Sequence, residues 1–393
     1  MRTLMRKADR SLGRGATLTL ALLDRLSRRF RGDVRSEAGQ EPRQILVIKL
    51  VGLGDTVLML TPLRRLREAF PGARIHALVT PLSIGILEGQ PQIDGLIVYD
   101  VLGDDKGLAG FIRLVQRLRG YGFDCVIDFE QYFQMSAIIS YLTRAQRRIG
   151  LYYPGNPRRH LLTDPVFLDP DLHMVDAYMG LLGPLGIPIE PVGVLEPVWI
   201  GPGDAREAER WLAERRQRPK GPLVGIHSGS GIRTPARRWP RERFAEIIRR
   251  ISAEYGADIV LTGGKSEVKL VDDILKQAGV DSAYSAAGCL TIKQTAALMR
   301  MCDLFISNDT GPVHIAASVG APTIGLFGPN IPQRYAPIGK ETSSIFKHVK
   351  CSPCVLIHKG MAKECGRGIC MEAIGVEEVW DEIRSYNLGR AKI

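Results

Sequence analysis

The segment Ser307 to Ala317 reads S-N-D-T-G-P-V-H-I-A-A and holds residue types that suit a bound diphosphate. The apolar residues Leu304 to Ile306 before it predict a buried parallel strand, and Val313 to Val319 predict a helix. Unpaired N–H groups at a helix start attract anions. Thr310 adds a hydroxyl there, and Gly311 lets the backbone approach a phosphate. The segment therefore predicts part of a nucleotide-diphosphate site.

Asp309 and His314 in the same segment can fix a ribose or orient the turn. A plainer interpretation is that Asp309 or Thr310 caps the helix, because Asp and Thr are common capping residues. The segment alone leaves both interpretations open.

A second loop, Ser228 to Pro240, precedes another predicted helix, which Pro240 suits at its first turn. It combines hydroxyl and glycine residues with arginines, a composition that predicts a pyrophosphate cradle. The alternative is a solvated basic loop. The candidate donor contacts in it are Ser228, Gly229, Thr234 and Arg238, and Arg237 is a candidate catalytic residue. In a third loop, Gly263 to Glu267, the carboxylate of Glu267 is a candidate contact to a ribose or base, or a helix cap.

Asp55 lies in the turn Gly52 to Thr56, directly after the first apolar strand. A carboxylate at the mouth of a first βα turn is well placed as a general base, and a helix cap is the alternative role. A dinucleotide-binding fingerprint would need a third glycine at position 57, where this chain has Val57. That departure argues against a nicotinamide-dependent oxidoreductase.

Alternating strands and helices must position these loops. In the first half the sequence predicts strands at 45–50, 75–79, 96–99 and 125–129, with helices at 56–69, 108–119 and 136–143. After the Pro- and Gly-rich stretch 184–222, the same alternation restarts at Leu223. The economical fold is α/β, with two Rossmann-like, doubly wound parallel-sheet domains that face a central cleft.

The expected domain boundaries follow from these composition changes. We expect a basic N-terminal extension at 1–43, an acceptor domain at 44–200, a linker at 201–222, a donor domain at 223–345 and a cysteine-bearing loop with a closing helix at 346–393. A length of 393 residues and 45% hydrophobic content suit two separate cores.

The net charge of +11 predicts an anionic partner. Aromatic residues make up 7% of the chain and are not interleaved with the basic ones, so we expect no nucleic-acid partner. Leu18, Leu22, Leu26 and Phe30 repeat every four residues among arginines, which favours an interfacial helix on anionic lipid; a packed or frayed extension is the alternative. No apolar run is long enough to span a membrane. We expect a cytoplasmic protein with peripheral contact to the inner face of the inner membrane.

Four of the seven cysteines, Cys351, Cys354, Cys365 and Cys370, crowd near the C-terminus. Four thiolates can bind zinc or an iron–sulfur cluster, although the middle gap is shorter than in common zinc ribbons. The alternative is a loop with reduced or disulfide-paired thiols. The sequence Asp169-Pro170-Asp171 formally matches a metal-binding D-x-D, but it has the composition of a turn.

Three motifs together resemble glycosyltransferase family 9, the ADP-heptose:lipopolysaccharide heptosyltransferases. They are I-L-V-I-K-L-V-G-L-G-D-T-V with T-P-L-R-R-L-R-E-A-F-P, the A-R-R-W-P loop, and S-N-D-T-G-P-V-H-I-A-A-S-V-G-A-P-T-I-G-L-F-G-P. The pieces Phe123 to Phe129 and Arg147 to Gly150 also fit, and the likeness runs from about Ile45 to the C-terminus. The resemblance implies a GT-B fold and an inverting sugar transfer that requires no metal or cofactor, with the acceptor in the first domain and the donor in the second.

The resemblance implies that Asp55 is the base and that Asp309, Thr310, Gly311 and His314 bind the donor. The family commonly has Lys in a K-R-W-P or K-H-W-P loop where this chain has Arg237, which keeps the charge but changes its reach. The implied donor is an ADP-heptose and the implied acceptor an anionic lipopolysaccharide core or similar glycolipid. Transfer from another nucleotide sugar to a different surface glycan remains an alternative.

Overall fold

The computed structural model describes residue 9 and residues 13–31, 41–231, 235–356, 361–362, 367–386 and 388. The chain divides into two compact units, Met1–Pro191 and Val192–Ile393. The division falls within the Pro- and Gly-rich stretch 184–222, and the residues from 192 to 222, including the expected linker 201–222, belong to the second unit. Helix α9 (Pro202–Ala213) lies within that stretch and packs against α12 (Ile292–Met301).

The first unit contains a six-stranded sheet in the order β3-β2-β1-β4-β5-β6, with every pair parallel. This is the Rossmann order, in which the direction of winding reverses between β1 and β4. Ligands of such sheets bind outside the carboxyl ends of the strands at that reversal. The strands are β1 (Gln44–Lys49), β2 (Arg74–Val79), β3 (Gly95–Val98), β4 (Cys125–Asp128), β5 (Arg147–Tyr152) and β6 (Asp164–Phe167).

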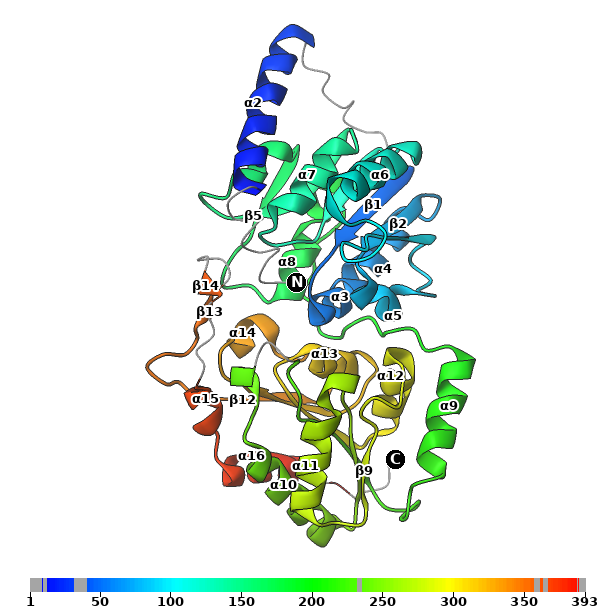
Figure 1. Ribbon diagram of the computed structural model, residues 1–393, viewed down its shortest axis with the longest axis vertical. Helices are drawn as coiled ribbons and strands as arrows, with labels where there is room; N and C mark the ends of the chain where they lie inside the picture. Colours follow the sequence, from blue (N-terminus) through cyan, green and yellow to red (C-terminus); the bar gives the residue numbers. More distant parts are fainter. Residues whose placement is uncertain are drawn as a thin grey trace. The chain divides into compact units, whose positions relative to one another are not determined.

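Helices cover both faces of this sheet. Leu114 and Leu118 of α6 and Ile139 of α7 pack with Leu46 and Ile48 of β1, and Figure 1 shows these two helices side by side. The helical segments are α2 (Arg14–Arg31), α3 (Leu53–Leu58), α4 (Leu60–Ala69), η2 (Pro81–Ser83), α5 (Ile84–Leu87), α6 (Gly107–Gly120), α7 (Gln134–Leu142), η3 (Pro157–Leu161), α8 (Met174–Gly180) and η4 (Gly183–Leu185).

Two details of the first unit differ from expectation. The helix expected at 56–69 is interrupted at Met59 and forms two helices, α3 and α4. The first of them already begins at Leu53. Asp55 therefore lies inside the first turn of α3 and does not cap it; the capping position is Gly52. The strands β5 and β6 were not predicted, because Arg147, Arg148 and Pro165 interrupt their apolar pattern.

The second unit repeats the architecture. Its sheet has the order β12-β11-β10-β7-β8-β9, again entirely parallel, and the winding reverses between β7 and β10. The strands are β7 (Leu223–His227), β8 (Asp258–Leu261), β9 (Ala283–Ser285), β10 (Leu304–Asn308), β11 (Thr323–Phe327) and β12 (Thr342–Phe346). A short antiparallel pair, β13 (Val355–Leu356) and β14 (Met361–Ala362), follows.

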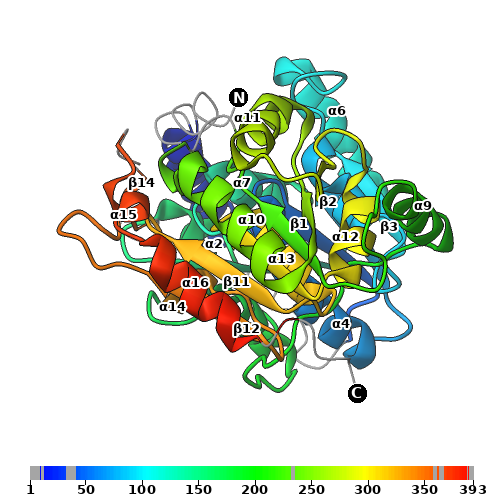
Figure 2. The same ribbon diagram turned by 90° about the horizontal axis from the view of Figure 1, so that it is seen from below.

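The core of the second unit lies between its sheet and α10, α11 and α16. Ile248, Ile274 and Ile383 are fully buried there, one from each helix. Figure 2 shows α16 running beside α10. The helical segments are α9, η5 (Pro235–Arg237), α10 (Arg241–Tyr255), η6 (Lys265–Glu267), α11 (Val268–Ala278), α12, α13 (Gly311–Ser318), α14 (Pro332–Tyr335), α15 (Ile369–Glu372) and α16 (Val376–Ser385). Together the two units have the α/β, GT-B type of fold that the sequence predicts.

The N-terminal helix α2 belongs to the first unit. Thr17 and Ala21 are buried, and Ala21 packs with Ile138 of α7 and Leu161 of η3. Leu18 and Leu22 are 53% and 59% exposed, so the part of the leucine stripe described in the structure points to solvent. Within the described part of the chain, no helix combines the length and the apolar character that a membrane span needs.

Candidate functional site

The reversal point of the first sheet places Asp55 at the carboxyl end of β1. Gly52, just before α3, has φ +97°, a conformation that side chains other than glycine rarely adopt. A Cβ atom at position 52 would lie 2.3 Å from Oδ2 of Asp55. Glycine is therefore required at this turn for two reasons: the backbone angle, and the space that the carboxylate occupies.

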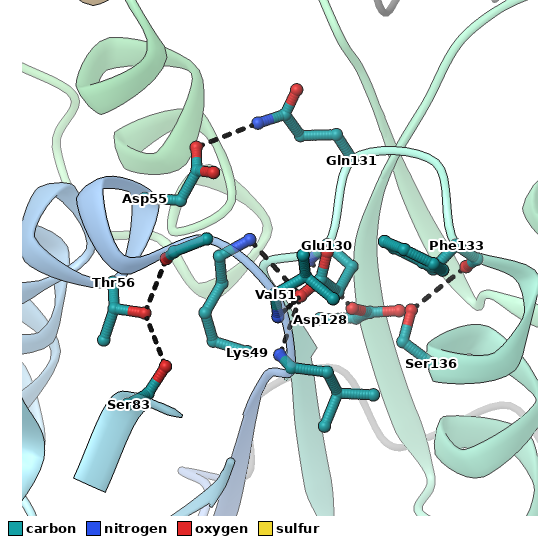
Figure 3. Close-up of polar contacts among 12 residues, drawn as sticks. Lys49, Val51, Asp55, Thr56, Ser83, Asp128, Glu130, Gln131, Phe133 and Ser136 are labelled. Carbon is teal, nitrogen blue, oxygen red and sulfur yellow. Dashed lines mark hydrogen bonds and ion pairs between the residues drawn. The ribbon is translucent and has the colours of Figure 1, made fainter. Parts of the chain in front are cut away.

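Two side chains from distant parts of the sequence contact the Asp55 carboxylate. Nε2 of Gln131 donates to Oδ1 at 3.1 Å, as Figure 3 shows, and the hydroxyl of Tyr178 donates to the same oxygen at 3.2 Å. Gln131 follows β4 and Tyr178 lies in α8. The carboxylate is half-buried and is held on one side by two donors.

A buried ion pair fixes the loops on both sides of this site. Nζ of Lys49, the last residue of β1, lies 3.3 Å from Oε1 of Glu130, and both side chains are almost fully buried. The same oxygen accepts the N–H groups of Leu50 at 2.7 Å and Val51 at 2.8 Å. Glu130 thus ties the loop after β4 to the turn that leads into Asp55.

A second buried pair lies behind the first. Arg158 of η3 pairs with Asp128, the last residue of β4, and both side chains are 0% exposed. Burial raises the pKa of Asp128, and the nearby Arg158 guanidinium opposes that rise. Arg158 also donates to the carbonyl oxygen of Glu130. An unpaired charge in this position would be costly, so the two residues depend on each other.

At the reversal point of the second sheet, Asp309 follows β10 and is buried. Its Oδ2 lies 3.3 Å from Nη1 of Arg237 and accepts a hydrogen bond from Nδ2 of Asn330 at 2.8 Å. These contacts bring Arg237 to the start of α13, where the sequence predicted an anion site. Arg237 and Asp309 are therefore brought together by the fold of one unit.

The residue at the capping position of α13 makes no capping hydrogen bond with its side chain. Thr310 occupies the capping position, but its hydroxyl donates to the carbonyl of Asn308 at 3.3 Å and makes no capping hydrogen bond. Thr310 therefore holds the capping position by its backbone, without satisfying a helix N–H group through its side chain. Gly311 opens the helix, Pro312 follows it, and His314 is buried within the helix.

Asn308 connects the two loops that form this end of the second sheet. Its Nδ2 donates to the carbonyl oxygens of Ser228 at 2.9 Å and Gly229 at 3.2 Å, and its Oδ1 accepts the N–H of Trp239 at 3.0 Å. Asn308 is fully buried. It determines how the loop that carries Ser228, Gly229 and Arg237 sits against β10.

Glu267 braces the same loop. Its carboxylate accepts the N–H groups of Gly231 at 2.9 Å and Gly264 at 3.0 Å, so the expected capping role at Gly264 is present. A Cβ atom at Gly229 would lie 2.0 Å from Oε1 of Glu267. Nε2 of His227 lies 3.9 Å from Oε2 of Glu267, and burial lowers the pKa of His227.

Three further sequence predictions concern Arg238, Thr234 and the segment Asp169-Pro170-Asp171. Arg238 donates to Oγ of Ser230 at 3.1 Å and to the carbonyl of Gly231 at 2.8 Å, so it points along its own loop. Thr234 lies outside the described residues. The N–H of Asp171 donates to Oδ1 of Asp169 at 2.9 Å, which is the closed turn expected of Asp169-Pro170-Asp171.

The C-terminal cysteines form no metal site among the residues that the structure describes. Cys351 is exposed, Cys354 is half-buried and Cys370 is buried, and Cys365 lies outside the described ranges. The metal expectation for the four cysteines stays a prediction.

Sequence reasoning missed six residues of these two sites: Lys49, Glu130, Gln131, Tyr178, Asn308 and Asn330. A signal for some of them existed, because Asp128 to Gln131 reads D-F-E-Q across the carboxyl end of a predicted strand. Polar residues at the end of a strand beside the reversal point are candidates for a site. Tyr178 had no comparable signal, since it lies in an ordinary helix.

Comparison with known proteins identifies the family of this chain. The profile of glycosyltransferase family 9 (heptosyltransferase) matches residues 111–364. The lipopolysaccharide core heptosyltransferase OpsX of Haemophilus influenzae is 27% identical over 308 residues, which cover 76% of this chain and 82% of OpsX.

Two solved structures share the fold. A family 9 glycosyltransferase from Veillonella parvula superposes with a TM-score of 0.74 at 25% identity, covering 88% of this chain and 97% of its own. The ADP-heptose LPS heptosyltransferase II of Escherichia coli superposes with a TM-score of 0.66 at 21% identity, covering 87% of this chain and 98% of its own.

Proposed function

This chain belongs to glycosyltransferase family 9, and on that premise we propose that it transfers a heptose from an ADP-sugar to a lipopolysaccharide core or similar glycolipid. Two relatives support the choice of substrates. One is a lipopolysaccharide core heptosyltransferase, and the other is an ADP-heptose LPS heptosyltransferase. The observation that carries the proposal is the start of α13, where Thr310 makes no capping hydrogen bond, beside the Arg237–Asp309 pair, which suits a diphosphate.

The proposed reaction inverts the anomeric carbon in one displacement. Asp55 takes the proton of an acceptor hydroxyl while its oxygen attacks the anomeric carbon, and the bond between that carbon and the diphosphate oxygen breaks on the opposite face. The electron pair of that bond leaves with ADP. The products are the extended glycolipid, ADP and a proton held on Asp55.

We propose that positive groups of the second unit stabilise the negative charge on the leaving diphosphate. Arg237 supplies a guanidinium that Asp309 orients at 3.3 Å, and α13 supplies the positive end of its dipole with the N–H group of Gly311, because Pro312 has no N–H group and Val313 donates to the carbonyl of Thr310. We propose that these positive groups take the part of a divalent cation, so that transfer needs no metal and no further cofactor. Glu267 and Asn308 contribute indirectly, because their hydrogen bonds hold the loop Ser228 to Gly231 in place.

Contact with a membrane surface is part of the proposal. Leu18 and Leu22 of α2 are exposed, and the chain carries a net charge of +11. An exposed apolar stripe on a basic protein suits the cytoplasmic surface of an anionic bilayer, where a glycolipid acceptor would be embedded. Co-sedimentation with phosphatidylglycerol vesicles but not phosphatidylcholine vesicles is expected, and Leu18→Ser with Leu22→Ser should weaken it.

An assay with purified substrates tests the transfer. The protein is incubated with ADP-heptose and truncated lipopolysaccharide acceptors, with and without EDTA, and the released nucleotide and the anomeric configuration of the product are determined. ADP release that depends on the acceptor, survives EDTA and inverts the anomer is expected. Turnover only with another nucleotide sugar would favour the alternative donor, and turnover lost in EDTA would contradict metal independence.

Variants of the two units separate the proposed roles. Asp55→Asn should abolish transfer apart from a trace rate and leave ADP affinity within a few fold. Arg237→Ala should weaken both donor binding and turnover, by about 10- to 1,000-fold in kcat, because charge stabilisation of a leaving group is of that size. The matched control is Arg249→Ala, an exposed arginine of α10 that pairs with Glu246. Unchanged kinetics in Arg237→Ala would remove it from the site.

A further inference from the structure

The hydrogen bonds to Asp55 are asymmetric. Gln131 and Tyr178 both donate to Oδ1, at 3.1 Å and 3.2 Å, and no donor among the described residues contacts Oδ2. Two donors on one oxygen fix the rotation of the carboxylate about its Cβ–Cγ bond. The oxygen that remains to accept a proton is Oδ2, the one that lies over Gly52.

The two donors are themselves held rigidly. Tyr178 is fully buried in α8, and its ring packs edge-to-face against Phe129 with 5.3 Å between ring centroids. Gln131 is 3% exposed and follows Glu130, whose carboxylate is bound to Lys49 and to two backbone N–H groups. Side chains with so little freedom can define the position of the group they contact.

Lys49 joins the two supports. Its Nζ lies 3.3 Å from Glu130 and 5.9 Å from the centre of the Tyr178 ring. The same buried lysine thus packs beneath both the loop that carries Gln131 and the helix that carries Tyr178. If Gln131 and Tyr178 only stabilised the fold, they would not both need to donate to the same oxygen of the half-exposed Asp55 carboxylate.

We infer that Gln131 and Tyr178 are positioning residues for the general base: they hold Oδ1 of Asp55 so that Oδ2 faces the acceptor hydroxyl. This inference rests on the proposed function, since it assumes that Asp55 is the base. Neither residue touches the reacting atoms in this role. Each acts by restricting the carboxylate to a productive orientation, which is where proximity effects arise.

The test removes each donor while keeping its shape. Tyr178→Phe deletes the hydroxyl and keeps the ring against Phe129, and Gln131→Met keeps the length of the side chain without its N–H group. Each variant should lower kcat by about 10- to 100-fold, the value of a hydrogen bond to a charged group. KM for the ADP-sugar should change little, because the donor site lies in the second unit. Tyr121→Phe, an exposed tyrosine stacked on Phe123, is the matched control.

A double-mutant cycle with Asp55→Asn gives the readout that a structural role would not produce. If Tyr178 and Gln131 act through Asp55, adding either change to Asp55→Asn should cause no further loss of the residual rate. An equal further loss in the Asp55→Asn background would overturn the inference, and so would an unchanged kcat in both single variants. Thermal melting identifies a variant that fails to fold, and the other variant then decides.

The two levels of the proposal fail separately. If Asp55→Asn keeps substantial turnover, the base assignment is wrong and the positioning role falls with it. If Asp55→Asn is inactive while Tyr178→Phe and Gln131→Met turn over like the parent, the proposed reaction stands and only the positioning role is refuted.

Discussion

Substituting Gly52 by alanine should disable the proposed base without touching any residue that contacts substrate. An ideal Cβ atom at position 52 lies 2.3 Å from Oδ2 of Asp55 and 3.1 Å from its Cγ. A comfortable contact between such atoms is about 3.5 Å, so the carboxylate oxygen must move by roughly 1 Å. A misplacement of that size in a reacting group costs about 100-fold in rate.

The same substitution also carries a backbone cost. Gly52 has φ +97°, and an L-residue with positive φ is strained by about 1–2 kcal/mol. Gly52→Ala should therefore lower the free energy of unfolding by at least that amount and lower kcat by about 100-fold. Chemical denaturation measures the first effect, and initial rates at saturating donor and acceptor measure the second.

Gly122→Ala is the matched control. Gly122 also has positive φ, at +64°, but a Cβ atom there meets nothing within 4 Å. It should lose stability and keep its activity. The reasoning is refuted if Gly52→Ala retains more than about a third of the parent kcat, or if Gly122→Ala loses as much activity as Gly52→Ala.

Two further predictions concern buried charge. Arg158→Met leaves Asp128 buried without its partner and should lower the free energy of unfolding by about 3–5 kcal/mol. Adding Asp128→Asn to the same chain should restore part of that loss. A loss below about 1 kcal/mol in Arg158→Met would contradict the pairing. Burial lowers the pKa of His227 below its ordinary 6.5. As the pH falls through 6.5, His227 is protonated in the unfolded chain before it is protonated in the native state, so the free energy of unfolding falls. Against the effect of burial, the pKa of nearby Glu267 is lowered by His227 and by backbone hydrogen bonds, so Glu267 should not titrate over this range. His227→Gln should therefore flatten the fall in melting temperature between about pH 7.5 and pH 5.5, and an equally steep fall in the variant would show that other groups cause it.

The strands that the sequence located well are those buried on both faces. β1 (Gln44–Lys49) lies within one residue of the predicted range 45–50, and β10 (Leu304–Asn308) contains the predicted range 304–306, because a parallel strand covered by helices on both sides needs a continuous apolar run. β12 (Thr342–Phe346) has mostly half-buried polar residues and was missed, as an edge strand carries little of that signal. The two-domain fold follows from the repeated alternation of strands and helices.

The sequence also located the turns where chemistry occurs. Asp55 and Asp309 each follow an apolar strand and precede a helix, and this local pattern is readable without coordinates. The loop with Arg237 was recognised in the same way. Local patterns thus determined which turns of the chain to consider, and the resemblance to a family indicated their roles.

Only the tertiary structure decided which side chains support those turns. Gln131 is 76 residues from Asp55 and Tyr178 is 123 residues from it, yet both contact the same oxygen. Asn308 likewise reaches carbonyl groups about 80 residues away, at Ser228 and Gly229. Such partners are chosen by the order of strands in each sheet, which places β4 beside β1 and β10 beside β7. Strand order depends on the packing of the whole unit, and hydrophobic periodicity within a short segment carries no record of it.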